Sequence, residues 1–280
     1  MDLGLAGRSC VVTGASRGFG AETARLLCAE GANVLLVARN EERLLAAAET
    51  ARDAGTAAAG ESGADAQASG RAESLSLDIT SADAGERMLA AATGHFGRLD
   101  VLVNNAGAAQ WRHLDDVPDE DWYAQHELNV MAPLRAMRAA APGMAERGWG
   151  RIVNVCSTAG KRPSASMPEY SVAKAGELSL SRLFADRYAQ SGVLVNAICP
   201  GPVKSEMWMD PGGLLDQSHE MSGAESREAA LAEAGAKRPI GRLAEVGEIA
   251  AAIVFLCSER ASYTAGAAWS VDGGTVQVII

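Results

Sequence analysis

The sequence is short of positive charge, of long apolar runs and of motifs that bind metals. Its 25 Lys and Arg residues against 35 Asp and Glu residues give a formal net charge of -10. That sign disfavours binding to nucleic-acid phosphates or to an anionic membrane. No window approaches about 18 consecutive apolar residues, so no membrane-spanning helix is expected. The N-terminal segment lacks a basic stretch and a long apolar core, so we expect no signal peptide and a cytoplasmic protein.

The five cysteines and four histidines form no CxxC, HxH or HExxH pattern. These are the spacings typical of metal sites. Most of the cysteines lie within apolar runs such as SCVV and NAICP. We therefore expect buried, reduced thiols and no metal site.

Short apolar runs alternate with amphipathic segments along the chain. The apolar runs are residues 9–14, 33–38, 73–77, 99–105, 151–157, 193–198 and 267–272. The helical patterns between them are residues 20–30, 41–53, 82–94, 119–147, 168–190 and 245–258. Most of the runs are β-branched and apolar on both faces, which is typical of buried parallel strands. The alternation predicts an α/β fold in which residues 1–280 form a single domain around a doubly wound parallel sheet of seven strands.

Two segments interrupt this alternation. Residues 54–71 are almost entirely Ala, Gly and Ser with a few charges, a composition that indicates a flexible insertion without a catalytic role. Residues 202–239 follow the sixth strand, at the sheet edge where ligands bind in such folds. This segment carries Met207, Trp208 and Met209. We expect it to form a substrate-binding lid or to pack as an ordinary helical hairpin.

A glycine-rich turn, TGASRGFG, connects the first predicted strand to the first predicted helix. Gly14, Gly18 and Gly20 allow a tight turn and a close approach of backbone amides to a pyrophosphate. The helix that follows points its positive N-terminus at that anion. The alternative is a plain glycine-rich strand-to-helix turn.

The end of the second predicted strand indicates which dinucleotide would bind. An NAD-selective site usually has an acidic residue there for the ribose 2′-hydroxyl. Here Ala38 is followed by Arg39, and Arg17 adds a second cation within the turn. A guanidinium matches a 2′-phosphate in charge and geometry. We therefore expect NADP(H) rather than NAD(H).

The stretch EYSVAK places Tyr170 and Lys174 one helical turn apart. Residues at i and i+4 share a helix face, and a nearby ammonium lowers the pKa of a phenol. The pair could therefore act as a general acid and base near neutral pH. Tyr and Lys are common, so the spacing can also arise by chance.

Taken together, these motifs resemble the short-chain dehydrogenase/reductase family over nearly the whole chain. TGASRGFG looks like its TGxxxGxG cofactor turn, and LDIT, NNAG, CPGPVKS and VDGG are similar to further family segments. The resemblance implies a Rossmann-like fold and an NADP(H)-dependent oxidoreductase acting on a small-molecule carbonyl or alcohol. The cofactor-binding residues that it implies are Gly14, Ser16, Arg17, Gly18, Phe19, Gly20, Arg39, Asp78, Ile79, Asn105, Ala106, Gly107, Tyr170, Lys174, Pro200, Gly201, Val203 and Ser205.

The same resemblance implies a catalytic set of Asn129, Ser157, Tyr170 and Lys174. Tyr170 would donate a proton in reduction and accept one in oxidation. Ser157 would hold the substrate oxygen, and Asn129 would help to anchor a water that relays protons to Lys174. Considered without the family, Ser157 could cap the turn after its strand, and Asn129 could form a hydrogen bond on a helix face.

The substrate is less well defined by the sequence. Candidate contacts are Gln110, Trp111, Met207 and Trp208, and an apolar surface with few polar groups suits a ketone or secondary alcohol of small to medium size. One alternative is a 3-oxoacyl-[acyl-carrier-protein] reductase, which would need a basic rim for its acidic carrier. The arginines that could form such a rim are Arg135, Arg138, Arg147 and Arg151. The other alternative is a non-catalytic NADP(H)-binding sensor or scaffold, although such proteins typically lose the tyrosine or the lysine.

The chain ends in an apolar tail, residues 275–280. Such a run would favour association if it were exposed on a monomer. Relatives in the family commonly form tetramers in which the last strand and tail pack between subunits. We therefore expect a homotetramer, with a dimer, or a tail folded onto its own subunit, as alternatives.

Overall fold

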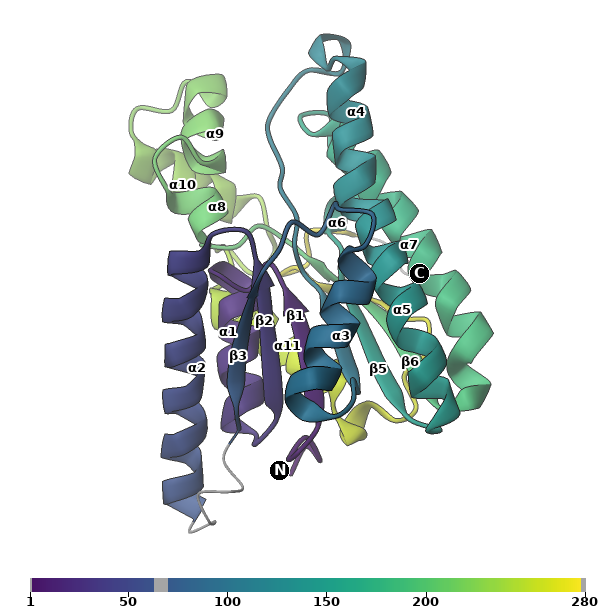
Figure 1. Cartoon of the computed structure of the whole chain (residues 1–280). Coiled ribbons are helices and arrows are strands. Elements are labelled where there is room, and N and C mark those ends of the chain that lie inside the picture. Colours follow the sequence, from purple (N-terminus) through teal and green to yellow (C-terminus); the bar gives the residue numbers. More distant parts are fainter. Residues whose placement is uncertain (1, 63–69, 278–280) are drawn as a thin grey trace.

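A computed structural model of the chain describes residues 2–62 and 70–277. One parallel sheet of seven strands, in the order β3-β2-β1-β4-β5-β6-β7, lies between two layers of helices (Figure 1). The strands are β1 (Ser9–Thr13), β2 (Asn33–Ala38), β3 (Ala72–Ser76), β4 (Val101–Asn104), β5 (Gly150–Val155), β6 (Val193–Pro200) and β7 (Ala268–Val271). The Rossmann-like, single-domain prediction is confirmed. Because the strand order reverses between β1 and β4, the ligand site of such a sheet lies outside their carboxyl ends.

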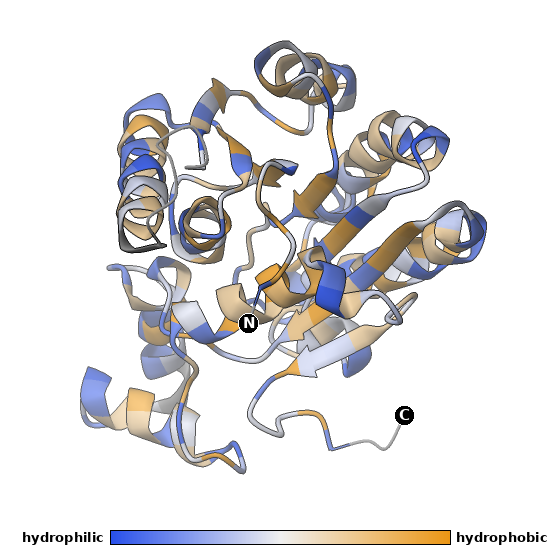
Figure 2. Ribbon diagram, turned by 90° about the horizontal axis from the view of Figure 1, so that it is seen from below, coloured by the Kyte–Doolittle hydropathy of each residue, from blue (hydrophilic) through white to orange (hydrophobic). Residues whose placement is uncertain are grey.

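Successive residues of the central strands face opposite helix layers. In β1 and β2, Val12 and Leu36 pack towards α1 (Gly18–Ala29), α2 (Glu41–Ser62) and α11 (Val246–Cys257). Their neighbours Val11 and Leu35 pack towards α3 (Ala84–Phe96), α5 (Ala132–Glu146) and α7 (Pro168–Tyr188). Figure 2 shows the apolar strands inside and the polar colours on the outer helix surfaces. Burial on both faces explains why these strands read as continuous apolar runs.

The second helix is longer than the sequence indicated. We expected a loop over residues 54–71, but α2 continues to Ser62. Alanine is the strongest helix former, and glycine is used here for close packing. A Cβ on Gly55 would lie only 2.8 Å from the carbonyl oxygen of Gly70 and 3.1 Å from that of Cys28. The rest of the expected insertion, residues 63–69, lies outside the described residues.

The long helix expected over residues 119–147 is interrupted. It consists of α4 (Asp119–His126), a π-helical turn η3 (Glu127–Met131) and α5. Single π turns inside α-helices are frequent at functional sites, and this one contains Asn129.

Residues 202–239 form three short helices beyond the carboxyl edge of the sheet (Figure 1). They are α8 (Glu206–Met209), α9 (Leu214–Ser222) and α10 (Arg227–Ala236). Leu214 and Leu215 at the start of α9 are buried, whereas Met207 and Trp208 are partly exposed. The remaining short helices are η2 (Leu114–Asp116), α6 (Thr158–Lys161), η4 (Ala189–Ser191) and η5 (Glu259–Ala261).

Three of the four arginines considered for a basic rim, Arg135, Arg147 and Arg151, do not lie together. Arg135 pairs with Glu127 and donates to the carbonyl of Thr80, near the carboxyl edge of the sheet. Arg147 instead donates to the carbonyl of Leu99, just before β4 at the amino edge. Arg151 is 3% exposed at the start of β5. Residues close in the sequence therefore lie at opposite edges of the sheet, and Arg135 cannot form one basic rim with Arg147 and Arg151.

The first residues of the C-terminal tail fold back on their own chain. Thr275 Oγ1 donates to the Asp272 carbonyl at 2.6 Å, and the Val276 amide donates to the Asp272 carboxylate at 2.9 Å. Residues 278–280 of the expected association tail lie outside the described residues. Among the described helices, none has the length and apolar character needed to cross a membrane.

Candidate active site

A cavity of about 1370 Å³ opens at the carboxyl edge of the sheet. Its wall includes the turn after β1 and the segments that follow β4, β5 and β6. Every residue predicted to bind the cofactor lines it except Gly20, which lies behind the turn. The structure therefore brings together segments that lie far apart in the sequence, as expected for the edge of a parallel sheet.

The glycine turn after β1 is fixed by contacts that leave no room for side chains. Gly14 has a φ of +65°, and a Cβ on it would lie 2.8 Å from the Cα of Ala106. Asn105 Nδ2 donates to the carbonyls of Thr13 and Gly14 at 2.8 and 3.3 Å. The Thr13 hydroxyl accepts the amides of Asn105 and Ala106 at 3.0 and 3.1 Å. The turn after β1 and the loop after β4 thus form one rigid unit.

Cations surround the end of β2. Arg39 and Arg43 line the cavity, as does Asn40, whose side chain accepts the Arg43 amide at 2.9 Å. Sequence analysis identified Arg39 but missed Arg43, although an Asn before a helix is a recognised start signal and would have placed Arg43 in the first turn. Arg17 also lines the cavity, and its guanidinium pairs with Asp210 at 3.0 Å.

Asp78, one of the residues predicted to bind the cofactor, follows β3 and lines the cavity. Its carboxylate accepts the amide and the hydroxyl of Thr80 at 3.0 and 2.7 Å. These hydrogen bonds lower the pKa of Asp78, with a smaller contribution from Arg39. The carboxylate is therefore charged and fixed in position at neutral pH.

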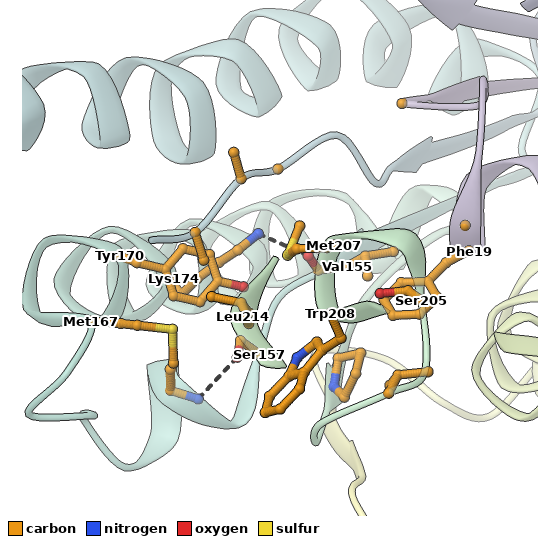
Figure 3. A pocket seen from close by; sticks show the side chains of 18 of the residues that line it. Phe19, Val155, Ser157, Met167, Tyr170, Lys174, Ser205, Met207, Trp208 and Leu214 are labelled. Carbon is orange, nitrogen blue, oxygen red and sulfur yellow. Dashed lines mark hydrogen bonds between the residues drawn. The ribbon is translucent and has the colours of Figure 1, made fainter. Parts of the chain in front are cut away.

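Tyr170 and Ser157 meet at the cavity wall (Figure 3). Ser157 follows β5, where its hydroxyl accepts the Ala159 amide at 3.1 Å and caps α6. Tyr170 lies in the first turn of α7, and its ring centroid is 5.7 Å from Lys174 Nζ. Burial raises the pKa of Tyr170, while Lys174 and a hydrogen bond with Ser157 act in the opposite direction. The lysine acts with the expected sign, but burial outweighs it, so the expected shift towards neutral pH is wrong.

Lys174 is held by two acceptors that the motif did not reveal. Its Nζ donates to the Val155 carbonyl at 2.9 Å and to Glu177 Oε2 at 2.7 Å. Both side chains of this ion pair are almost fully buried, at 3% and 2% exposure. Although burial acts to lower the pKa of Lys174, Glu177 and Tyr170 raise it above its ordinary value. The lysine is therefore a permanent cation.

Asn129 is fully buried in the π turn η3. Its Nδ2 donates to the Gln125 carbonyl at 3.0 Å and to the Gln125 side chain at 2.7 Å, while its Oδ1 has no partner among the described residues. A Cβ on Gly107 would lie 3.4 Å from Asn129 Oδ1 and 3.7 Å from Lys174 Nζ. The two polar atoms thus face the same small space beside the cavity.

The opposite wall of the cavity is more apolar. Met207 and Trp208 line the cavity as predicted, together with Leu214 (Figure 3). Trp111 also lines the cavity, as predicted. Gln110 does not line the cavity, because its side chain is exposed and accepts a hydrogen bond from Arg112 at 2.7 Å. Arg238, Thr275 and Val276 line the cavity but were missed, because residues distant in the sequence reach it only through the tertiary fold.

Comparison with known proteins gives consistent matches over the whole chain. A family model described as short chain dehydrogenase matches residues 8–212. D-beta-hydroxybutyrate dehydrogenase from Cupriavidus necator is 34% identical, over 97% of this chain and 99% of its own. The 3-oxoacyl-[acyl-carrier-protein] reductase FabG from Vibrio cholerae is 33% identical, over 99% and 100%. The crystal structure of L-sorbose reductase from Gluconobacter frateurii, complexed with NADPH and L-sorbose, has a TM-score of 0.86 at 32% identity and covers 100% of both chains.

Proposed function

The chain belongs to the short-chain dehydrogenase family, and we propose that it transfers a hydride between NADP(H) and a ketone or secondary alcohol of small to medium size. One observation carries the proposal. Tyr170, Ser157 and Lys174 lie on the wall of the same cavity as the glycine turn after β1. A proton donor and a dinucleotide-binding turn that share one cavity are what carbonyl reduction requires.

The residues at this edge fit a dinucleotide. Gly14 and Gly18 have positive φ angles of 65° and 57°, and the latter begins α1, whose N-terminus favours an anion. Asp78 and Asn105 are fixed by the hydrogen bonds described above. When bound, the dinucleotide would supply or take up the hydride at its nicotinamide ring. Every other requirement of the reaction falls to side chains of this chain.

Tyr170 is the proposed acid. Its phenolic oxygen holds the proton that a carbonyl oxygen needs during reduction, and it takes that proton back during oxidation. Ser157 lies with Tyr170 on the wall of the cavity and acts on the phenol, so its hydroxyl can stabilise charge that develops on the substrate oxygen. Lys174 supplies a fixed positive charge next to the phenol. The partnerless Oδ1 of Asn129 beside Lys174 fits the expected relay water.

The preference for NADP(H) rests on charge. Arg39 and Arg43 line the cavity next to the end of β2, and no carboxylate occupies the position after Ala38. Arg17 contributes less, because Asp210 already neutralises it in this structure. The L-sorbose reductase that resembles this chain was crystallised with NADPH, which supports the same choice.

We further propose that α8 and α9 form the substrate-binding lid, because Met207, Trp208 and Leu214 cover the apolar wall of the cavity.

A cytoplasmic homotetramer, or alternatively a dimer, remains the proposed assembly. Trp269 supports it, because this residue is 41% exposed on β7, an edge strand of the sheet. The molar mass in solution tests this, and a monomer would contradict it.

Replacing Tyr170 with Phe tests the reaction. We expect Tyr170→Phe to lose carbonyl reduction by a factor of about 100 to 10,000, the usual contribution of general acid catalysis. NADPH binding, measured by fluorescence titration, should change little. Retained turnover would remove the proposed acid. Failure of the native protein to consume NADPH with any activated carbonyl would favour the non-catalytic alternative.

A 3-oxoacyl-[acyl-carrier-protein] reductase is the second candidate, supported by the similarity to FabG from Vibrio cholerae. The separation of Arg135 from Arg147 and Arg151 removes the basic rim that would have favoured it. Steady-state rates with a 3-oxoacyl thioester and with a panel of ketones separate the two functions. We expect higher kcat/KM for a ketone, and a strong preference for the thioester would reverse the assignment.

A further inference from the structure

Glu177 is an acidic residue buried next to the proposed catalytic lysine. It lies on α7, three residues after Lys174, with an exposed fraction of only 1%. Its Oε2 is 2.7 Å from Lys174 Nζ. Burying a carboxylate costs several kcal/mol of desolvation, and an apolar residue of similar volume often stabilises a fold as well or better. Packing alone therefore does not account for Glu177.

The ion pair fixes how the ammonium of Lys174 is oriented. An ammonium has three N–H donors, and Lys174 gives one to Glu177 and one to the Val155 carbonyl. The space beside Gly107, which also receives Asn129 Oδ1, lies near the same Nζ. With two donors bound to protein, the third is available for this space. Glu177 thus determines both the position and the rotation of the lysine head group.

The carboxylate also counters the lysine's effect on the phenol. The ionisable groups that act on Tyr170 are Lys174 and Glu177 from α7 and Cys156 from the end of β5. Cys199 on β6 also lies close enough to interact with Glu177. Burial raises the pKa of both thiols, so at neutral pH they are uncharged. Burial raises the pKa of Glu177, while Lys174 acts to lower it. Because its carboxylate lies 2.7 Å from the Lys174 ammonium, Glu177 is the anion that opposes Lys174 in this group.

We propose that Glu177 is a positioning residue that holds the ammonium of Lys174 in place and offsets its positive charge beside Tyr170, which favours the protonated phenol that carbonyl reduction needs. The inference rests on the proposed role of Tyr170 as the acid. Reduction needs the protonated phenol and oxidation needs the phenolate. Because Glu177 offsets the positive charge beside the phenol, oxidation begins only at a higher pH than it would with Lys174 alone.

A direct titration of the phenol tests this without cofactor or substrate. The absorbance of Tyr170 phenolate is obtained as the difference between each protein and its Tyr170→Phe counterpart. In Glu177→Gln, which keeps the shape but removes the charge, we expect the midpoint to fall by about one pH unit, because an opposing charge at close range is lost. Asp186→Asn is the matched control, since this exposed carboxylate lies on the same helix and pairs only with Arg182 among the described residues. Its midpoint should not move.

Two further variants separate the effect of the Glu177 charge from an effect on folding. Glu177→Met removes the carboxylate but fills similar volume, so it should show the same fall if Glu177→Gln does not fold. Glu177→Asp retains the charge and should return the midpoint towards that of the native protein. A midpoint that is unchanged or raised in the neutral variants overturns the inference.

Turnover supplies the second readout. The pH at which alcohol oxidation reaches half its maximal kcat should fall in Glu177→Gln by the same amount as the phenol midpoint. A merely structural role would lower kcat at every pH without moving this profile, and that outcome also overturns the inference. If instead Tyr170→Phe retains turnover, the proposed function fails, whatever the titration shows.

Discussion

Substitution of Gly20 by Ala would show how tightly the glycine turn is built. A Cβ at this position would lie 2.5 Å from Asn105 Nδ2, 2.5 Å from the Gly14 carbonyl and 2.9 Å from the Ala15 Cα. Two of these atoms belong to the backbone, so the turn must move. Overpacking of this kind costs about 1–3 kcal/mol. Loss of one amide contact to a phosphate, about 1.5–3 kcal/mol, would weaken NADPH binding by roughly 10- to 150-fold.

Gly94→Ala is the matched control, because Gly94 lies within α3 and a Cβ there would meet nothing within 4 Å. That variant should gain up to about 1 kcal/mol from helix propensity and leave NADPH binding unchanged. Thermal unfolding and fluorescence titration with NADPH measure the two effects. We expect the thermal unfolding midpoint of Gly20→Ala to lie several degrees below that of Gly94→Ala. Each kcal/mol of lost stability lowers this midpoint by about 2–4 °C. Equal midpoints and equal NADPH affinities would refute the reasoning.

Three further results are expected. Arg39→Asp should weaken NADPH at least about tenfold more than NADH, as the loss of a charge-assisted contact to the 2′-phosphate predicts; an unchanged ratio of dissociation constants would show that another residue selects the cofactor. Because burial raises the pKa of Tyr170, the phenol stays protonated to higher pH, so alcohol oxidation should still rise with pH above neutral while reduction stays level; oxidation that levels off below neutral pH would contradict this. Hydrogen bonds from Arg242 and the Glu245 backbone hold the pKa of Glu248 at about 2, so the stability this residue contributes is present above its ordinary pKa and is lost as pH falls towards 2. In Glu248→Gln the loss at neutral pH should be less than about 1 kcal/mol, because the pair is exposed, and the difference from the native protein should vanish near pH 2 in chemical unfolding.

The parts of the fold that the sequence predicted are those set by repeating patterns. Residues 33–38 were expected as a strand and form β2 with the same limits. The pattern was clear because residues 34–38 are buried on both faces of the sheet and are all apolar. The segments that build the site follow directly from such strands, and the edge on which they meet follows from parallel topology.

The errors arose where tertiary packing determined the structure. Residues 54–62 have the composition of a linker, yet they extend α2 because Gly55 lets this helix approach Cys28 and Gly70 closely. The π turn around Asn129 depends on hydrogen bonds shifted by one residue, which leave no trace in composition.

The chemistry of the lysine was incomplete for a similar reason. Sequence analysis did not identify Glu177, because a Lys and a Glu three residues apart on a helix often pair at the surface. Only the packing of α7 against β5 and β6 shows that this pair is buried. The same burial reverses the expected direction of the Tyr170 shift.

The reactivity of the cysteines would report how often the structure around each thiol unfolds locally. All five are buried, and burial raises the pKa of Cys28 and Cys257 to about 12. Reaction with an alkylating reagent therefore requires the surrounding structure to separate first. Cys10 on β1 packs in one core cluster with Cys28 on α1 and Cys257 on α11. Cys156 and Cys199 pack in a separate cluster, and Cys156 lines the cavity. The order in which these thiols become modified would distinguish local unfolding around the cavity from unfolding of the whole sheet.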